Sequence, residues 1–280
     1  MSFDPTTVAL PRALSPSRLL DFQSCPRKYE YSAVLKLPQP ASYASVKGRF
    51  VHAILERLFG LEPDQRTRAA ADHFIPEAIE VEITPEVRTD LAYDDDLEAT
   101  LLAETKHILD QYFTMEDPTA VVLYEHEDKK AVELPLTAAI KGAPLYGILD
   151  RLDRDEDGSL VIVDYKTGKY PSGDYVTSAF ANAAIYVALC EAELKERPSK
   201  VRLLYVASGQ PLERRTEEIF PDQRADAAAE AWVSIKAAHA AGNFEPTPSA
   251  SACRFCPTDY QARCRAEGVP VVVPSPRRRY

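Results

Sequence analysis

The stretch LYGILDRLDRDEDGSLVIVDYK, residues 145–166, decides the fold of this chain. Its first apolar run, residues 145–152, predicts a β-strand. The acidic run DEDG at residues 155–158 predicts a turn, and the apolar residues 160–165 predict the strand that returns. The stretch therefore predicts a β-hairpin with charged residues at the far end of both strands.

Two carboxylates and a lysine lie at that end of the hairpin. Asp150 and Asp164 are brought close together when the two strands pair. Lys166 lies two residues beyond Asp164, so we expect both side chains on the same face of their strand. Two acids and a cation that converge suit a divalent metal ion bound beside a phosphate.

Outward from the hairpin, the apolar periodicity changes between helical and strand-like. An amphipathic helix is expected at residues 45–59, with Phe50, Val51, Ile54, Leu55 and Leu58 facing inward. Further helices are expected within 64–115 (with a break at 84–96), at 175–196 and at 223–241, and further strands at 121–127, 131–139, 201–207 and 214–220. The order predicts an α/β fold: a mixed central sheet with flanking helices and a helical N-terminal part.

The bulk composition limits the class of protein. With 280 residues, of which 45% are hydrophobic, the chain is long enough for a packed core. A formal net charge of −10 argues against coating nucleic acid by bulk charge, but a local basic groove remains compatible with it. We find no apolar run of membrane-spanning length and no secretory signal, and expect a cytoplasmic protein without a membrane partner.

The expected organisation is one domain between two tails. A flexible leader is expected at residues 1–13 and a basic tail at residues 267–280, where Arg277-Arg278-Arg279 favours disorder over phosphate binding. The domain covers residues 14–266, divided into a mainly helical part (14–117), a sheet core (118–242) and a cysteine segment (243–266). The acidic run Asp94-Asp95-Asp96 is interpreted as solvated charge at a helix start.

Five motifs, in order along the chain, resemble the PD-(D/E)XK nuclease superfamily, in particular its RecB-type exonuclease branch with an iron–sulfur cluster. This branch includes CRISPR-associated adaptation nucleases and the nuclease domains of helicase–nuclease complexes. The matching stretches are Leu14 to Leu19 with Cys25 to Tyr29, Gly48 to His52, Gly147 to Arg151, Val163 to Lys169, and Cys253 to Cys256 with Cys264. The resemblance implies the restriction-endonuclease-like core, in the order αβββαβ.

The resemblance also implies roles for the acidic site. Asp150 and Asp164 are then carboxylate ligands of Mg²⁺ or Mn²⁺, the backbone carbonyl of Tyr165 is another ligand, and His52 is a further one. An imidazole ligand favours Mn²⁺ over Mg²⁺. Lys166 is expected to hold the attacking water or to offset charge in the transition state.

Three more residues are candidates for substrate contact or support. Glu125 is expected on the strand before the hairpin, as a further metal or water ligand, and the alternation does not separate it from Glu127. In the resembled family the helix after Asp-x-Lys carries Gln-x-x-x-Tyr. Here the matching residues are Asn182 and Tyr186, and the shorter amide could weaken turnover or alter substrate choice.

The cysteines divide into a candidate metal site and a core residue. Cys253-x-x-Cys256 followed by Cys264 has metal-ligand spacing, and by resemblance Cys25 is the fourth ligand. Four thiolates fit either a [4Fe–4S] cluster or tetrahedral Zn²⁺, and spacing alone does not separate them. The resemblance favours the cluster, as a brace between the two ends of the domain. Cys190 lies in an apolar helical stretch and is expected in the core.

Two functions from different classes fit these observations. The first is a metal-dependent DNA exonuclease that hydrolyses phosphodiester bonds, at single-stranded DNA ends, in DNA repair or recombination. The second is a non-catalytic DNA-binding or scaffold subunit of a repair or adaptation complex that keeps the nuclease fold. The sequence contains no phosphate-binding Gly-x-x-x-x-Gly-Lys-Ser/Thr motif, so any unwinding is expected from a helicase partner.

Overall fold

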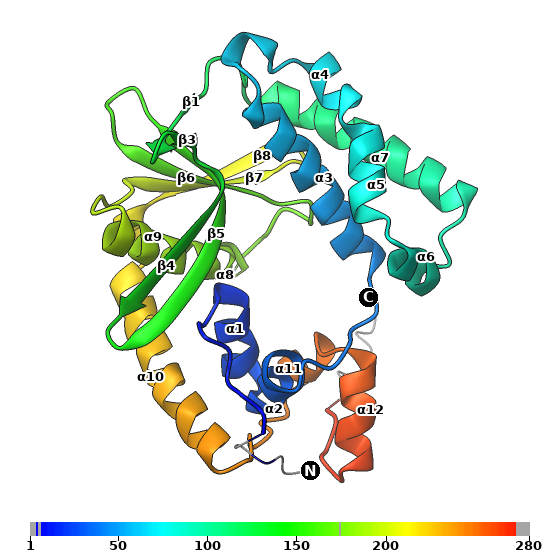
Figure 1. The fold of residues 1–280 in the computed structure, drawn as a ribbon, viewed down its shortest axis with the longest axis vertical. Coiled ribbons are helices and arrows are strands. Elements are labelled where there is room, and N and C mark those ends of the chain that lie inside the picture. The colour runs from blue at the N-terminus through cyan, green and yellow to red at the C-terminus, as the bar shows by residue number, and fades with distance from the viewer. Residues whose placement is uncertain (1–3, 5–6, 174, 273–280) are drawn as a thin grey trace. The chain divides into compact units, whose positions relative to one another are not determined.

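The computed structural model describes residue 4 and residues 7–173 and 175–272 (Figure 1). The arginine run 277–279 lies outside the described residues. The chain divides into two compact units, the first from 1–39, 137–146 and 223–280 and the second from 40–136 and 147–222. Among the described residues, every helix is too short or too polar to cross a membrane.

The described part of the second unit begins with five α-helices. They are α3 (Tyr43–Gly60), α4 (Arg68–His73), α5 (Ile75–Glu82), α6 (Pro85–Leu91) and α7 (Asp95–Met115). All of them start at a polar capping residue except α5, which follows Phe74. Ser42 caps α3 and Asp94 caps α7, each by accepting a hydrogen bond from a backbone N–H of the first turn. The acidic run at 94–96 is therefore helix-start charge, as expected. The five residues expected inward on the first helix are all fully buried on α3.

The described residues contain a six-stranded mixed sheet, of which the strand residues within 137–146 belong to the first unit and all other strand residues to the second. Its strands are β1 (Val122–Leu123), β4 (Val132–Ile140), β5 (Ala143–Arg154), β6 (Leu160–Tyr165), β7 (Lys200–Tyr205) and β8 (Gln210–Arg215). The strand order is β1-β5-β6-β7-β8, with β4 paired to β5. The β5–β6 and β7–β8 pairs are antiparallel and β6–β7 is parallel. This α/β fold with a mixed central sheet confirms the fold class predicted from the sequence.

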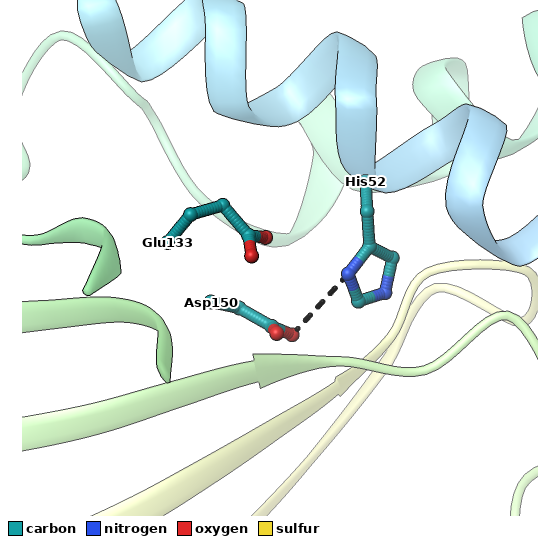
Figure 2. A group of neighbouring side chains, drawn as sticks. All are labelled: His52, Glu133 and Asp150. Atoms are coloured by element: carbon teal, nitrogen blue, oxygen red, sulfur yellow. Dashed lines mark ion pairs between the residues drawn. The ribbon is translucent and has the colours of Figure 1, made fainter. Parts of the chain in front are cut away.

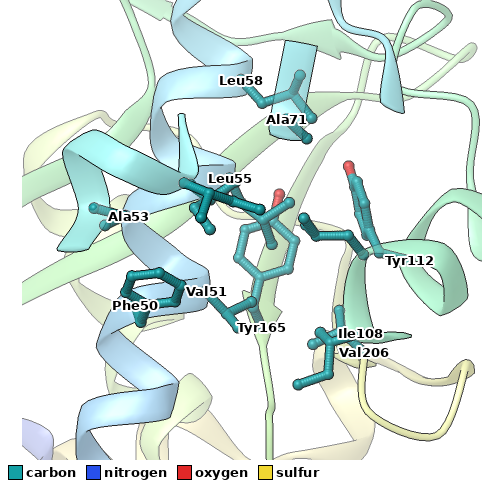
Figure 3. Packing of buried hydrophobic residues seen from close by; sticks show 14 of the residues in the cluster. Phe50, Val51, Ala53, Leu55, Leu58, Ala71, Ile108, Tyr112, Tyr165 and Val206 are labelled. Carbon is teal, nitrogen blue, oxygen red and sulfur yellow. The ribbon is translucent and has the colours of Figure 1, made fainter. Parts of the chain in front are cut away.

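The parallel pair requires a helical crossover, which α8 (Tyr175–Ala179) and α9 (Ala181–Glu193) supply. The single helix expected at 175–196 is thus interrupted at Phe180, whose ψ of 0° leaves the helical range. Every residue of β6 is buried, which explains its continuous apolar run. Figure 3 shows the ring of Tyr165, the last residue of β6, inserted among buried side chains of α3 and α7.

Two expected strands were placed wrongly. The strand expected at 214–220 begins at Gln210 and gives way to a 3-10 turn at Thr216–Glu218. Gly209, with φ +62°, allows a tight turn directly after β7, so the return strand starts early. The strand expected at 121–127 is divided into β1 and a separate two-stranded hairpin of β2 (Glu125–His126) and β3 (Lys129–Lys130).

The first unit joins segments far apart in sequence. It contains α1 (Pro16–Ser24), α2 (Pro26–Tyr29), a π-helical turn (Glu30–Val34), most of α10 (Pro221–Ala240), α11 (Ala250–Arg254) and α12 (Thr258–Ala266). Tyr29 packs on Phe244 with ring centroids 5.8 Å apart, and Tyr31 packs on Tyr260 at 5.2 Å. These aromatic contacts fix the N-terminal helices against the C-terminal ones within this unit.

Gly147 on β5 is required by its close neighbour. A Cβ at this position would lie 2.6 Å from Cε1 of Tyr186 on α9, closer than packed atoms approach. Gly147→Ala is therefore expected to destabilise the protein by roughly 1–3 kcal/mol, the usual cost of overpacking a core. Urea unfolding measures this. Gly158→Ala is no useful control because of its φ of +81°, whereas Gly168→Ala meets open space and should change stability little.

Candidate metal and phosphate site

Three potential metal ligands converge between α3 and the sheet (Figure 2). Ligand atoms of His52, Glu133 and Asp150 all lie within 4.8 Å of one another. His52 Nδ1 lies 3.6 Å from Asp150 Oδ2, and its Nε2 lies 3.1 Å from the carbonyl oxygen of Tyr165. One imidazole thus faces a carboxylate and the backbone carbonyl that were both predicted as ligands.

The hairpin brings the two predicted aspartates together. The last residue pair of β5 and β6 is Arg151 with Val163, and Asp150 and Asp164 are the next residues on the two strands. Asp150 Oδ2 accepts a hydrogen bond of 2.7 Å from the backbone N–H of Tyr165. This bond fixes the carboxylate across the end of the hairpin.

Lys166 forms an ion pair with the second aspartate. Its Nζ lies 2.5 Å from Asp164 Oδ2, and the Asp164 carboxylate is largely buried. Burial is the largest effect and lowers the pKa of Lys166, but the charge and hydrogen bond of Asp164, together with the charge of Asp150, outweigh it, so this pKa is raised. The amine is therefore a fixed cation beside the two carboxylates.

Glu133 on β4 is a member of this site that sequence reasoning missed. Burial and the neighbouring Asp150 raise its pKa to about 7. Burial and Asp164 likewise raise the pKa of Asp150 to about 6. Carboxylates crowded in this way carry an excess of negative charge that a divalent cation would neutralise. The donor set, three oxygen donors and an imidazole, also suits such a cation.

The mouth of the site is an open pocket of about 430 Å³. Its lining includes His52, Glu133, Glu56 and the ion pair Arg49–Glu82, whose Nε–Oε2 distance is 2.8 Å. Gly48 lies on this wall, where an added Cβ would come within 3.3 Å of Thr167 Oγ1. The pocket gives solvent and ligands access to the His52 side of the carboxylates.

The remaining predicted site residues have different positions. Glu125 is exposed on β2, opposite Lys130, and is not a member of the group around Asp150. Asn182 Oδ1 on α9 is buried and accepts no hydrogen bond from the described residues. Tyr186 is largely buried on the same helix, and its pKa is raised by burial and by Asp164, Asp150 and Glu133. Tyr186 therefore lies within the electrostatic field of the acidic site, and its supporting role stays a prediction.

A buried arginine holds the hairpin from behind. Arg151 is completely buried, and its guanidinium donates to both carboxylate oxygens of Asp153 at 2.9 Å and to Glu116 at 2.5 and 2.9 Å. It also donates to the Tyr165 hydroxyl at 2.8 Å and lies 4.3 Å from the centre of the Phe59 ring. Asp153, two residues before the acidic turn at 155–158, is a buried residue of β5 that neutralises this cation. The network connects α7 to both strands of the hairpin.

The four cysteines expected as ligands lie around one pocket in the first unit. Cys25 at the start of α2 lies opposite Cys253 on α11, Cys256 just after it and Cys264 on α12. Burial raises the pKa of Cys256 to about 11, Lys28 opposes this and the other three thiols add to it. Gln261 Nε2 donates to the carbonyls of Cys253 and Cys256 at 2.9 and 3.0 Å. Cys190 is fully buried on α9, as a core residue.

Comparison with known proteins identifies the family to which the chain belongs. The sequence profile of the PD-(D/E)XK nuclease superfamily matches residues 13–265. The chain belongs to the PD-(D/E)XK nuclease superfamily. The superfamily is named after a motif that ends in Asp/Glu-x-Lys, and the matching residues here are Asp164-Tyr165-Lys166. Nucleases of this superfamily use divalent metal ions and act on DNA, and the acidic group at Asp150 fits that chemistry.

Two relatives of this PD-(D/E)XK protein extend the comparison. The Gene 69 protein of Mycobacterium phage L5 is 26% identical over 136 residues, 48% of this chain and 44% of the phage protein. One subunit of an ATP-dependent helicase/deoxyribonuclease from Streptococcus equi subsp. zooepidemicus (strain H70) is 32% identical over 166 residues, 56% of this chain and 14% of the streptococcal protein. The chain thus spans less than half the length of either relative.

Neutralising Asp150 in this PD-(D/E)XK site is expected to stabilise the metal-free protein. Because burial and Asp164 raise its pKa from 3.8 to about 6, the ionised carboxyl opposes folding, increasingly from about pH 4 and fully above pH 6. Asp150→Asn removes this charge and should add roughly 1–3 kcal/mol at pH 8. Thermal melting in a chelator measures the change.

Added Mn²⁺ provides the matching control for this variant. A cation that binds only the folded protein raises its melting temperature with concentration. Mn²⁺ should raise the melting temperature of the wild type more than that of Asp150→Asn. The variant lacks one metal ligand, and it has less repulsion between carboxylates for the cation to relieve. An equal gain in both proteins would place the cation elsewhere.

Proposed function

We propose that this protein is a metal-dependent deoxyribonuclease whose active site is formed by Asp150, Asp164 and Lys166. The observation that carries the proposal is the convergence of His52, Glu133 and Asp150 beside the Asp164–Lys166 ion pair. Carboxylates and an imidazole for a cation, together with a fixed amine for a phosphate, are what phosphodiester hydrolysis requires.

The ligand set that we propose for Mg²⁺ or Mn²⁺ consists of Asp150, Asp164, the Tyr165 carbonyl and His52. Glu133 is added because the structure places it among them. When bound, the cation supplies Lewis-acid polarisation of the phosphate and a more acidic water. The Tyr165 N–H holds Asp150 in place through the 2.7 Å hydrogen bond, so the ligand set is arranged before the cation arrives.

Lys166 is proposed to act on the phosphate and its attacking water. Its ammonium donates hydrogen bonds and carries a positive charge, so it stabilises the negative charge that grows on the phosphoryl oxygens. The pairing with Asp164 keeps the lysine charged and limits its side-chain freedom. Tyr186 and Asn182 on α9 support this arrangement from the adjacent helix.

We further propose exonuclease action on single-stranded ends in DNA repair or recombination, with a helicase partner. The relative from Streptococcus equi is named as part of a helicase/deoxyribonuclease, which supports this class of partner. The present chain has no Gly-x-x-x-x-Gly-Lys-Ser/Thr motif for nucleotide binding, so separated strands must be supplied to it.

Linear and circular single-stranded DNA distinguish this activity from its alternatives. With Mn²⁺ or Mg²⁺, the purified protein should shorten linear end-labelled strands and leave covalently closed circles intact. Cleavage of the circles would indicate an endonuclease. Binding without cleavage under both metals would support the second candidate, a non-catalytic DNA-binding subunit. The specific observation in its favour is Asn182 in place of glutamine, whose Oδ1 accepts no hydrogen bond from the described residues.

A [4Fe–4S] cluster is proposed at Cys25, Cys253, Cys256 and Cys264. All four line one pocket, and Arg27 and Lys28 on its wall offset thiolate charge. Four thiolates suit either this cluster or tetrahedral Zn²⁺, and the resemblance of the ordered motifs is what favours the cluster at this pocket.

The colour of protein purified without air tests the cluster. A brown sample with a broad absorbance near ~400 nm is expected for thiolate-bound iron–sulfur centres. Cys190→Ser, which removes a thiol outside the pocket, should keep the colour if the variant folds, whereas Cys253→Ser should lose it. A colourless protein that contains one equivalent of zinc would show that these cysteines bind zinc and not an iron–sulfur cluster.

A further inference from the structure

A tyrosine lies beside the amine of the proposed active site. The parallel register pairs Tyr165 with Leu204, so Tyr205 is the next residue opposite Lys166. The backbone bonds agree, because Lys166 N donates to Leu204 O at 2.8 Å and Val206 N donates to Lys166 O at 3.0 Å. Neighbours paired across a sheet point to the same face, so Tyr205 and Lys166 share the face of the sheet.

The electrostatics agree with that placement. Burial raises the pKa of Tyr205, while Lys166 lowers it and Asp164 raises it. The phenol therefore lies within the field of the Asp164–Lys166 pair. Tyr205 is only 6% exposed, so it cannot itself present a ring face to a ligand.

A second tyrosine packs on the first and remains in solvent. The rings of Tyr170 and Tyr205 have centroids 5.2 Å apart and an interplanar angle of 65°. Tyr170 is 37% exposed, although it lies only four residues beyond Lys166. An edge contact with a buried ring holds Tyr170 in place and leaves part of its own ring uncovered.

An exposed cation precedes the exposed ring. Lys169 is exposed, and no ion pair joins it to a carboxylate among the described residues. Lys166, in contrast, pairs with Asp164. An exposed ammonium that follows a proposed phosphate site in the sequence, together with a partly exposed aromatic ring, is the combination that binds single-stranded nucleic acid.

We propose that Tyr170, held by Tyr205, stacks an unpaired base next to the phosphate at Lys166, and that Lys169 contacts a neighbouring phosphate. The inference rests on the proposed function for the identity of the ligand as DNA. Bases inside a duplex are covered on both faces by their neighbours, so an exposed tyrosine face selects unpaired nucleotides. The surface formed by Tyr170 and Lys169, here called the stacking patch, would thus give the site its preference for single-stranded ends.

Binding of single-stranded DNA in the absence of a divalent cation tests the stacking patch independently of cleavage. The probe is a short single-stranded oligonucleotide with 2-aminopurine at one position, whose fluorescence falls when the base stacks. Scanning this position along the strand should find one quenched site with the wild-type protein. Tyr170→Ala should lose that quenching and weaken binding about 5- to 100-fold, the loss expected for one stacked base.

Matched variants separate stacking from folding and from charge. Tyr170→Phe keeps the ring and should restore both the quenching and the affinity. Lys169→Ala should weaken binding and reduce its salt dependence while the quenching is kept, whereas Lys236→Ala, on exposed α10 surface, should change neither. Binding of blunt duplex should respond little to Tyr170→Ala.

Two outcomes would overturn the proposal. One is unchanged quenching and affinity in Tyr170→Ala, and the other is an equal loss for single-stranded and duplex DNA. If the protein stacks the base but cleaves no DNA with Mn²⁺ or Mg²⁺, the stacking patch is supported and the nuclease proposal is wrong.

Discussion

Replacing Lys166 by methionine should lower kcat/KM for DNA cleavage by at least about 100-fold, the scale seen when one preorganised donor to a developing oxyanion is removed. The methionine keeps the length of the side chain and removes its charge. Without the ammonium, the phosphoryl oxygens lose a donor and Asp164 loses its 2.5 Å partner. Initial rates on end-labelled single strands, at saturating Mn²⁺, measure the effect.

Lys166→Arg is the sharper control, because it keeps the positive charge. Its planar, bulkier guanidinium cannot take the place of the compact ammonium beside Asp164, so activity should remain low. Lys236→Met removes an exposed lysine elsewhere and should be as active as the wild type. If Lys166→Met cleaves normally while folded, the assignment of this lysine to the active site is wrong.

Removal of Arg151 should cost about 3–5 kcal/mol of stability, the range for breaking a buried ion pair on one side only. Arg151→Met leaves Glu116 and Asp153 buried without their cation. Burial alone would raise the pKa of Glu116, but Arg151 and its hydrogen bonds outweigh this and lower it. Denaturant unfolding at pH 7 measures the loss.

The adjacent arginine is a matched control. The side chain of Arg154 on β5 is 31% exposed and pairs with Glu196, compared with 0% for Arg151. Arg154→Met should cost less than about 1 kcal/mol, as surface pairs do. The loss in Arg151→Met should also shrink at low pH, where the two acids become neutral. Equal losses in the two variants would mean that the network contributes no more than a surface pair.

The hairpin and the first core helix were predictable because each has a local signal. Alternating or continuous apolar residues bounded by an acidic turn specified β5 and β6, and β6 has the expected bounds. The periodicity of α3 specified its buried face, and the helix extends only two residues earlier and one later than expected. Asp150, Asp164 and Lys166 follow from this local register, which is why their juxtaposition could be predicted.

Glu133 could not be recognised in the same way. Its φ of +46° interrupts the regular alternation of β4, so the strand pattern gives no reliable face for this side chain. The expected acid, Glu125, was sought on the segment 121–127, which pairs elsewhere. The available signal was only that Glu133 is a charged residue among Val132, Leu134 and Leu136.

The partners of Arg151 were also beyond local reasoning. Glu116 lies 35 residues before Arg151, at the end of a helix, and no short-range pattern connects them. Asp153 lies only two residues before the acidic turn at 155–158, so the sequence alone groups it with those solvated acids. Only tertiary packing distinguishes a solvated carboxylate from one that neutralises a buried guanidinium.

The first unit is built from both ends of the sequence, so the two units cannot be completed at the same time during translation. Cys25 and Cys264 line the same pocket but are 239 residues apart in the chain. At about 5–20 residues per second, a ribosome needs roughly 10–50 s to travel between them. All residues of the second unit, 40–136 and 147–222, are translated in that interval, before α11 and α12 of the first unit. Loading of any inorganic centre that uses all four cysteines must therefore wait until Cys264 has been translated.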